Sequence, residues 1–370
     1  MNRPLKVAIL CPGVGLVQRG FERLFRDLFD EVSGHCEVVL FKGGGPQSER
    51  EKRVAFLARG GAFLRYVPLH KLIGRTPMHI ECLTFALSVL PSLIAGKFDV
   101  VHAIDPPLAR ILFHLRRVTG AKFRLLYTEG TAMPPEDYPP ADHIHQISAA
   151  TFADAARHGH CEASMTTIPC GVRTAKFTTK ESKAALRERY GIAQDQFVVL
   201  SIAALNRGHK RTHYLIDEFS KVPEGPLLWI DGSLDHGDPD LPDLARVTLG
   251  ERVKITHVES AKVAELFKMA DLFVHTAGFE AFGLSIVEAA ICGLPILTHN
   301  DAHFRWLIPG PKCQIDMMEP GALSSKITEL AQNPEVLPAY TATDYAHRTY
   351  AWEALRQPYL ALYQSVAGAV

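Results

Sequence analysis

The sequence predicts an α/β protein built from two doubly wound, Rossmann-like units that follow one another along the chain. Short apolar segments alternate with stretches whose apolar residues repeat at helical spacing, which is the order expected of parallel strands joined by crossover helices. This alternation restarts after a connector at residues 168–172. The first apolar strand of the second series begins at Phe197. The length of 370 residues agrees with two domains.

The first unit is predicted to cover residues 1–171 and the second residues 172–349. In the first unit, strands are expected at 7–10, 38–41, 100–103, 123–127 and 144–147, with a helix over 21–32. In the second, a charged helix at 180–190 precedes strands at 197–202, 227–230, 253–255, 272–275 and 295–297. Ligands of open α/β sheets bind beyond the carboxyl ends of the strands, so we expect the site in a cleft between the two units.

A C-terminal helix is predicted where apolar residues repeat at helical spacing from Tyr350 to Val366. Pro358 falls inside this pattern and has no backbone N–H to donate. We therefore expect the helix to be kinked or divided in two at this position.

The composition is that of a soluble protein and argues against several functional classes. Lys+Arg and Asp+Glu each number 40, so no global charge points to nucleic acid. The seven cysteines form no CxxC pair, which favours reduced thiols in a cytoplasmic protein over a disulfide framework or a zinc site. The N-terminus shows no signal-peptide pattern, and the longest apolar run, 83–95, is expected to be too short to span a bilayer.

Two glutamates with seven residues between them are the strongest functional signal. Glu280 lies in a turn of small residues at 277–283, and Glu288 lies in an apolar stretch that is predicted to be helical. Backbone N–H groups at the start of such a helix attract an anion, while the two carboxylates can bind hydroxyl groups on either side of it. A diphosphate between two sugars fits this layout. Burial of Glu288 without a partner would be costly, which favours a ligand or an internal pairing.

A basic loop at 206–211 follows the first strand of the second unit. Lys210, with Arg207 as a candidate assistant, is placed to neutralise a diphosphate at the carboxyl end of that strand. The alternative is a solvated basic loop that serves no ligand.

Three features of the first unit allow both a functional and a structural interpretation. Gly13 and Gly15 follow the first strand and let the backbone approach a ligand, or they form an ordinary tight turn. Glu129 follows a later strand as an acid/base group, an acceptor-orienting group or a plain turn residue. His102 and Asp105, near the end of another strand, are open in the same way.

Residues 50–75 carry seven Lys or Arg and a single acid, Glu51, together with several large apolar side chains. This composition suits a basic amphipathic surface that docks on anionic lipid. It equally suits a flexible acceptor-side loop that starts at the three glycines 43–45.

Taken together, these motifs resemble the retaining glycosyltransferases of family 4, which have the GT-B fold. The resemblance rests on the E-x7-E signature at 280–288 followed by CGLPIL, the interdomain segment at 168–177, the lysine-bearing helix start at 209–216, the sequence GFER at 20–23 and the C-terminal helix with Trp352 and Tyr363.

The resemblance implies a metal-independent transfer, with retention at the anomeric carbon, of a sugar from a UDP- or GDP-sugar to an acceptor hydroxyl. The acceptor would be a small molecule, a glycan or a lipid-linked molecule, and no cofactor would be needed. It also implies that the C-terminal helix, 350–370, packs back on the first unit.

The resemblance also implies a role for each site residue. Glu280 would bind the transferred sugar, Glu288 the ribose, and Lys210 the departing nucleoside diphosphate. The remaining contacts would be made by the backbone N–H groups of Phe282, Gly283 and Leu284 to the diphosphate, by Thr256, His257 and Val258 near the base, and by Gly13 and Gly15 over the donor.

Two departures from the family pattern affect the expected catalytic groups and the identity of the transferred sugar more than the reaction class. A Gly-Arg pair common in the family is replaced here by residues 203–206, so Arg207 is expected to substitute for that arginine. A histidine of the acceptor domain is replaced by Glu129, which either performs its role or leaves it unfilled. The alternatives are therefore a nucleotide-sugar hydrolase or epimerase on the same fold, and a glycosyltransferase-like binding protein without turnover.

Overall fold

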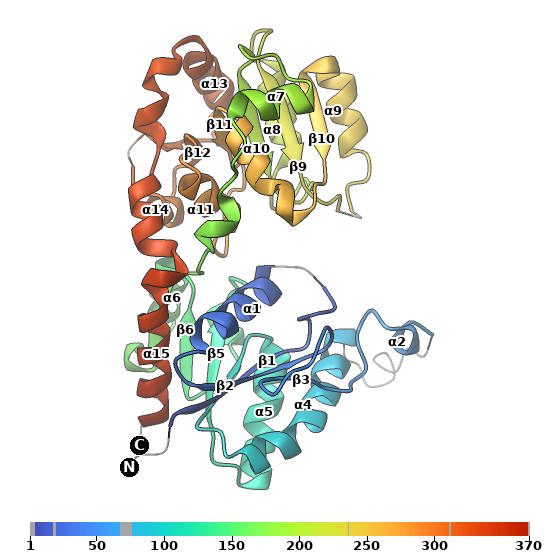
Figure 1. Ribbon diagram of the computed structural model, residues 1–370, viewed down its shortest axis with the longest axis vertical. Coiled ribbons are helices and arrows are strands. Elements are labelled where there is room, and N and C mark those ends of the chain that lie inside the picture. Colours follow the sequence, from blue (N-terminus) through green and yellow to red (C-terminus); the bar gives the residue numbers. More distant parts are fainter. Residues whose placement is uncertain (1–3, 18–19, 67–75, 236, 311, 369–370) are drawn as a thin grey trace. The chain divides into compact units, whose positions relative to one another are not determined.

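The computed structural model describes residues 4–17, 20–66, 76–235, 237–310 and 312–368. The chain divides into two compact units. Unit 1 comprises Met1–Gly171 with Trp352–Val370, and unit 2 comprises Val172–Ala351. Figure 1 shows a central sheet flanked by helices in each unit.

Unit 1 is built on a seven-stranded sheet in the order β3-β2-β1-β4-β5-β6-β7, and every neighbouring pair is parallel. Its strands are β1 (Lys6–Cys11), β2 (Glu37–Lys42), β3 (Glu51–Arg53), β4 (Val100–Ala103), β5 (Arg124–Glu129), β6 (His143–Gln146) and β7 (Met165–Thr167). Its helices are α1 (Gly20–Val32), α2 (Ala62–Tyr66), α4 (Pro77–Gly96), α5 (Pro106–Thr119), α6 (Ala149–Arg157) and α15 (Trp352–Gly368), with 3-10 turns at Pro135–Asp137 and Glu162–Ser164.

Unit 2 has a six-stranded parallel sheet in the order β10-β9-β8-β11-β12-β13. Its strands are β8 (Val198–Ile202), β9 (Leu227–Asp231), β10 (Val253–Thr256), β11 (Leu272–Val274), β12 (Ile296–His299) and β13 (Gln314–Ile315). Its helices are α7 (Lys183–Tyr190), α8 (Thr212–Ser220), α9 (Leu241–Leu249), α10 (Val263–Met269), α11 (Leu284–Ile291), α12 (Ala302–Leu307), α13 (Ala322–Gln332) and α14 (Thr343–Tyr350), with 3-10 helices at Thr174–Phe177, Gly250–Arg252, Ser260–Lys262 and Pro334–Tyr340.

The prediction of two doubly wound parallel sheets is confirmed. In each sheet the strand order reverses once, between β1 and β4 in unit 1 and between β8 and β11 in unit 2. Loops that leave the carboxyl ends of the two strands at such a switch point diverge and leave a crevice for a ligand. In unit 2 these are the loops that carry Lys210 and Glu280.

The apolar strands form the cores because both faces of a parallel sheet are covered by helices. In unit 1, Ala8, Val101 and Leu125 are fully buried against α4 and α5, and in unit 2 Val199 and Leu228 are buried in the same way. The strands that the sequence did not predict are β3, β7 and β13, which have two or three residues each and little apolar pattern.

The stretch 50–75 is not a plain loop where the structure describes it, because it begins with β3 and includes α2. The charged strand β3 pairs with β2, and Glu51 accepts hydrogen bonds from Lys42 and from Arg26 (2.6 Å). Lys42 is only 2% exposed, so the single acid of this stretch compensates a buried charge.

Helix α4 contains the longest apolar run, and the expectation about its length was wrong. The helix begins at Pro77, six residues before that run, and its 20 residues are long and apolar enough to cross a membrane by length and composition. Only 44% of its most apolar window is buried inside the structure. One side of α4, including Phe85 and Val89, packs into the core of unit 1.

The C-terminal helix α15 belongs to unit 1, as the fold prediction requires. It is not divided at Pro358, because the helix runs through this residue to Gly368. The interruption between α14 and α15 lies at Ala351. The indole of Trp352 lies against Gly171, where an added Cβ would come within 2.3 Å of it. A glycine is therefore needed where the chain first leaves unit 1.

A buried chain of hydrogen bonds ties α15 to three strands. The Tyr363 hydroxyl donates to His102 Nδ1 (3.0 Å), and His102 Nε2 donates to the Thr128 hydroxyl (2.6 Å). Thr128 donates to His145 Nδ1 (2.9 Å), and His145 Nε2 donates to the Ile168 carbonyl (2.8 Å). This sequence of donors requires both histidines to be neutral. Burial lowers the pKa of His102 and lowers that of His145 to about 4.

These buried hydrogen bonds predict that unit 1 loses stability in mild acid. Since the pKa of both histidines is below 6.5 in the folded chain, the unfolded chain takes up protons first as the pH falls. The contribution is complete above pH 6.5 and is lost toward pH 4, by up to about 1.4 kcal/mol per pH unit for each histidine.

Urea unfolding followed by Trp352 fluorescence, in a Trp229→Phe/Trp306→Phe background, measures this effect in unit 1. Replacement of both histidines by Gln should flatten the pH dependence between pH 6.5 and 4, whereas Tyr363→Phe should retain it. An unchanged slope in the double histidine variant would contradict the assignment.

Candidate functional site

The candidate site of unit 2 is formed by the loops after β8 and β11, which flank the switch point of its sheet. Lys210 lies just before α8, and Glu280 lies between β11 and α11. The structure brings the two residues together, since Lys210 Nζ forms an ion pair with Glu280 Oε1. Two candidates that lie 70 residues apart in the sequence therefore share one site.

Two histidines complete this cluster. His275 Nε2 lies 2.7 Å from Glu280 Oε1, and His209 Nε2 lies 3.6 Å from Glu280 Oε2. Burial lowers the pKa of His275, so the neutral ring donates its Nε2 hydrogen to the carboxylate. Burial would raise the pKa of Glu280, but the hydrogen bond from His275 and the charge of Lys210 lower it to about 2. Glu280 is therefore a carboxylate at neutral pH.

The rim of the cluster is partly aromatic. The His209 ring stacks on Phe279 with 4.7 Å between ring centroids, and its Nε2 lies 2.8 Å from the Phe279 carbonyl. Phe279 is 58% exposed, which is unusual for a phenylalanine. Sequence reasoning missed both histidines. His275 was visible as the last residue of the predicted strand 272–275, at its carboxyl end.

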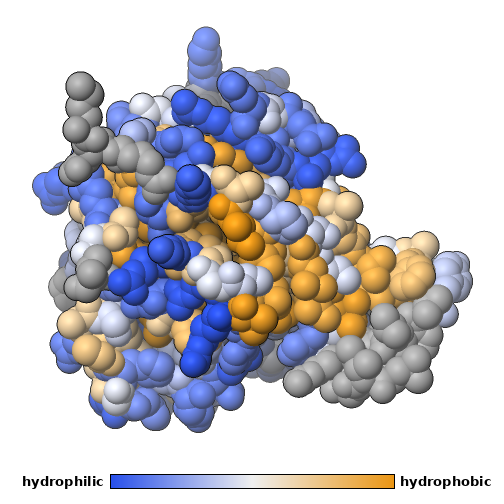
Figure 2. Space-filling model, turned by 90° about the horizontal axis from the view of Figure 1, so that it is seen from below, coloured by the Kyte–Doolittle hydropathy of each residue, from blue (hydrophilic) through white to orange (hydrophobic). Residues whose placement is uncertain are grey.

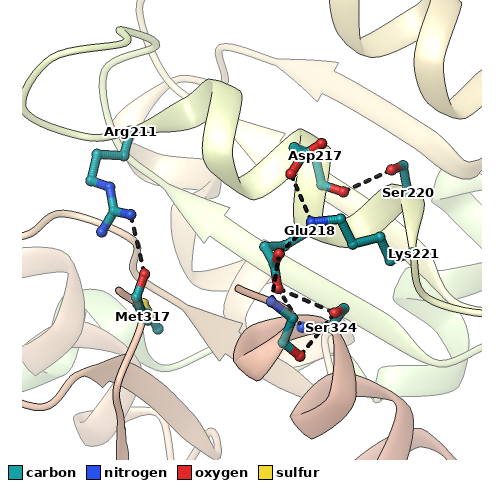
Figure 3. A network of polar contacts seen from close by, with 8 residues as sticks. Arg211, Asp217, Glu218, Ser220, Lys221, Met317 and Ser324 are labelled. Atoms are coloured by element: carbon teal, nitrogen blue, oxygen red, sulfur yellow. Dashed lines mark hydrogen bonds and ion pairs between the residues drawn. The ribbon is translucent and has the colours of Figure 1, made fainter. Parts of the chain in front are cut away.

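Helix α8 holds Lys210 in place because both of its ends are fastened to the segment that leads into α13. At its start, Arg211 donates to the Met317 carbonyl (3.2 Å). At its end, the buried carboxylate of Glu218 accepts the backbone N–H groups of Ser324 and Gly321 (3.1 Å each) and pairs with Lys221 (2.7 Å). Figure 3 shows these contacts around Glu218. Burial opposes ionisation of Glu218, but Lys221 and the two N–H groups lower its pKa.

The turn before α11 presents backbone donors. Gly283 has φ +98° at the N-cap, and a Cβ there would meet Ile286 at 3.0 Å and Leu307 at 3.1 Å. Within the described residues, no hydrogen bond to a protein group uses the N–H of Phe282, Gly283 or Leu284. Such N–H groups at the start of a helix are free to bind an anion. Glu288 follows on α11 and is 5% exposed.

Arg207 is directed to other partners. Its guanidinium donates to Asp240 (2.8 and 2.7 Å) and to Asp238 (3.2 Å), which raises its pKa, and its backbone N–H binds Asp238 (2.8 Å). No contact of Arg207 with Lys210 or Glu280 is found in the described part of the chain. The arginine thus holds the loop after β8 to the loop after β9.

The predicted base-binding segment is organised by Asp231, which sequence reasoning missed. Asp231 Oδ1 accepts the Thr256 hydroxyl (2.7 Å) and the Val258 N–H (2.9 Å), and Trp229 donates to Thr256 (2.8 Å). Thr256 and Val258 are therefore held by the end of β9. His257, between them, is exposed.

In unit 1, the carboxylate of Glu129 is used inside its own loop. Glu129 Oε1 accepts the N–H (2.6 Å) and the hydroxyl (2.8 Å) of Thr131, and Oε2 accepts the hydroxyl of Tyr127 (2.6 Å). The residue is fully buried. This network anchors the loop after β5, which includes Ala132 with φ +54°.

The carboxyl end of β4 carries an acid of a different kind. Asp105 precedes α5 and makes no side-chain cap there. Burial, together with the nearby Glu81 and Glu22, raises its pKa to about 6 against the opposing charge of Arg59.

The glycines after β1 have a packing reason. A Cβ on Gly13 would come within 2.2 Å of Glu22 Oε1, and a Cβ on Gly15 within 2.3 Å of the Gly44 backbone. Gly15 also has φ +82°. Close packing of this loop on α1 and on the loop after β2 requires both glycines, whether or not a ligand also approaches them.

No group of three or more His, Cys, Asp or Glu suited to a metal ion occurs among the described residues. The expectation of a metal-free site stays a prediction. The charges that the described part of the site offers to an anion are the ammonium of Lys210 and the N–H groups before α11.

Comparison with known proteins places this fold in a class. The structure superimposes on Anabaena Alr3699/HepE, solved in complex with UDP and glucose, with a TM-score of 0.76 at 18% identity, covering 98% of this chain and 100% of that chain. It also superimposes on a sucrose-phosphate synthase from Thermosynechococcus elongatus with a TM-score of 0.78 at 18% identity, covering 99% and 100%. The fold is therefore GT-B, as predicted.

Sequence comparison then gives the family. Residues 182–341, inside unit 2, match the family model of "Glycosyl transferases group 1". The chain is 26% identical to the alpha-monoglucosyldiacylglycerol synthase of Acholeplasma laidlawii over 253 residues, which are 65% of this chain and 59% of that protein. The match therefore spans about three fifths of the relative's length. Residues 182–341 therefore match the group 1 glycosyl transferases, and these findings support the resemblance of the chain to GT-B glycosyltransferases of family 4.

The structure predicts that Glu129 acts on stability. Glu129→Ala should destabilise unit 1 by about 1–3 kcal/mol, because the buried Tyr127 hydroxyl would be left without an acceptor and the loop would lose its two hydrogen bonds from Thr131. Thr131→Val, which removes one donor, should cost only about 1 kcal/mol. Urea unfolding followed by Trp352 fluorescence reports both values. Unchanged stability of the Glu129→Ala protein would show that the network is dispensable and would favour the catalytic role predicted for Glu129.

Proposed function

We propose that this protein transfers a sugar from a nucleoside-diphosphate sugar to an acceptor hydroxyl with retention at the anomeric carbon and without a metal ion. The observation that carries the proposal is the cluster of Lys210, Glu280 and His275 beside the N–H groups before α11. It joins a cation and helix-start donors, which suit a diphosphate, to an ionised carboxylate, which suits sugar hydroxyls.

A UDP-sugar is the donor we favour. Anabaena Alr3699/HepE, which shares the fold, was solved with UDP-glucose as well as with UDP and glucose. In the proposed complex the diphosphate lies at the start of α11, Glu280 accepts hydroxyl protons of the transferred sugar, and Glu288 binds the ribose. The ammonium group of Lys210 then contacts the phosphate oxygens, and its ion pair with Glu280 is weakened.

The proposed chemistry balances without further reactants. The bond between the anomeric carbon and the diphosphate oxygen breaks, and its electron pair leaves with the nucleoside diphosphate. The acceptor oxygen forms the new bond on the same face, and its proton passes to the departing phosphate oxygen. Lys210 and the N–H groups before α11 stabilise the charge that develops on the diphosphate, which is the role a divalent cation has in other transferases.

We further propose a cytoplasmic location. All seven cysteines are free in the structure, and Cys11, Cys82, Cys170 and Cys313 are buried. Unpaired buried cysteines are typical of reducing compartments.

Loss of Lys210 tests the site. Lys210→Ala should lower kcat/KM for transfer by roughly a hundredfold or more, because charge on the leaving group loses its main stabilising partner. Glu288→Ala should lower it through weaker donor binding. Lys326→Ala is the matched control, since this lysine of the same unit lies on α13 and pairs there with the exposed Glu329.

Release of labelled sugar from UDP-sugars, with and without an acceptor panel, provides the measurement, and NMR of the product gives the anomeric configuration. Wild-type rates in Lys210→Ala and Glu288→Ala would overturn the site assignment. Turnover without any acceptor would identify a hydrolase or epimerase, and nucleotide binding without turnover would identify a binding protein.

A further inference from the structure

Helix α4 has an outward face without any charge. Leu83, Leu87 and Ile94 lie on one side of the helix and are 38%, 50% and 46% exposed, and the exposed Pro91 continues the same stripe. The single ionisable acid of α4, Glu81, is buried and pairs with Arg59 (3.3 Å). A helix of 20 residues is about 30 Å long, so this apolar stripe is extensive.

Neighbouring segments extend the apolar face. The backbone N–H groups of Leu57 and Arg59 bind Thr84 (3.1 Å) and Glu81 (2.7 Å), so residues 57–59 lie along α4. They lead into α2, where Phe63 is 52% and Tyr66 is 79% exposed. Figure 2 shows the result, a band of apolar side chains that reaches the lobe at which α2 lies in Figure 1.

Basic residues border this face. Lys52 and Arg53 of β3 are exposed, and neither side chain forms an ion pair within the described residues. Arg53 and Leu57 are four positions apart in the sequence, so their Cα atoms lie within about 14 Å of one another. The acid of β3, Glu51, is engaged by Arg26 and Lys42.

We propose that the outward face of α4, together with α2 and the basic residues of β3, docks on the surface of an anionic lipid bilayer. Apolar side chains flanked by Lys and Arg match a membrane interface, where they enter the acyl boundary while the cations meet lipid phosphates. Charge selects this occupant over a second copy of the chain. A symmetric pairing of two such faces would bring the same basic residues together.

The burial of one side of α4 in the core of unit 1 favours docking on the bilayer surface over crossing of the bilayer. Cys82, Phe85, Ala86 and Val89 are almost fully buried in the core of unit 1, so insertion of the helix across a membrane would require the unit to unfold. Leu87 and Ile94 are available without any change in the fold. This surface lies in unit 1, and its use does not depend on the transfer reaction proposed for unit 2.

Co-sedimentation of the full chain with vesicles tests the proposal, without donor or acceptor present. Wild-type protein should bind vesicles of phosphatidylcholine with phosphatidylglycerol, should bind phosphatidylcholine alone much more weakly, and should be released by high salt. Lys52→Glu/Arg53→Glu should weaken binding to the anionic vesicles roughly thirtyfold or more. Leu83→Gln/Leu87→Gln should weaken it roughly tenfold.

The control is Val247→Gln, which changes an 87% exposed apolar residue of α9 in unit 2. This variant should bind the vesicles as the wild type does. Circular dichroism and thermal unfolding establish that the variants are folded, as expected for changes at exposed positions. Binding that shows no dependence on anionic lipid, or that Leu83→Gln/Leu87→Gln leaves intact, would overturn the proposal. So would a wild-type dimer in solution that the same double variant dissociates, because a second copy would then cover this face.

Discussion

The ion pair between Lys210 and Glu280 is the contact on which the rest of the site depends. It joins the loops that follow β8 and β11, and these loops meet because the strand order of the unit 2 sheet reverses between those two strands. The pair holds opposite charges beside helix-start N–H groups before any ligand binds. Each charge is already oriented, which would lower the reorganisation needed for binding of the proposed donor diphosphate.

Much of the molecule outside this pair serves to hold it. His275 donates to Glu280 from the end of β11, and its buried Nδ1 has no partner in the described residues. Glu218 fastens the far end of α8, and Arg211 fastens its start, so Lys210 directly precedes a fixed helix. Arg207 and Asp231 organise the neighbouring loops in the same way.

The sequence predicted the parts of this arrangement that follow from periodicity and order along the chain. Buried parallel strands are continuous apolar runs, so the larger strands could be located, and with them the loops at their carboxyl ends that carry Lys210 and Glu280. The sequence could not show which polar groups satisfy one another. Arg207 and Glu129 have the residue types of catalytic groups, yet Asp240 engages the first, and Tyr127 and Thr131 the second. The outward face of α4 was hidden for a similar reason, because burial of its inner side depends on the sheet.

The central claim is that a donor diphosphate binds the ammonium group of Lys210, which is now paired with Glu280, while Glu280 binds the sugar. A crystal structure of the protein with a UDP-sugar tests this most directly. The account predicts Lys210 Nζ within hydrogen-bond distance of a phosphate oxygen, the N–H groups of residues 282–284 on the diphosphate, and Glu280 accepting from a sugar hydroxyl. A diphosphate bound away from α11, with the ion pair between Lys210 and Glu280 facing no part of the donor, would contradict it.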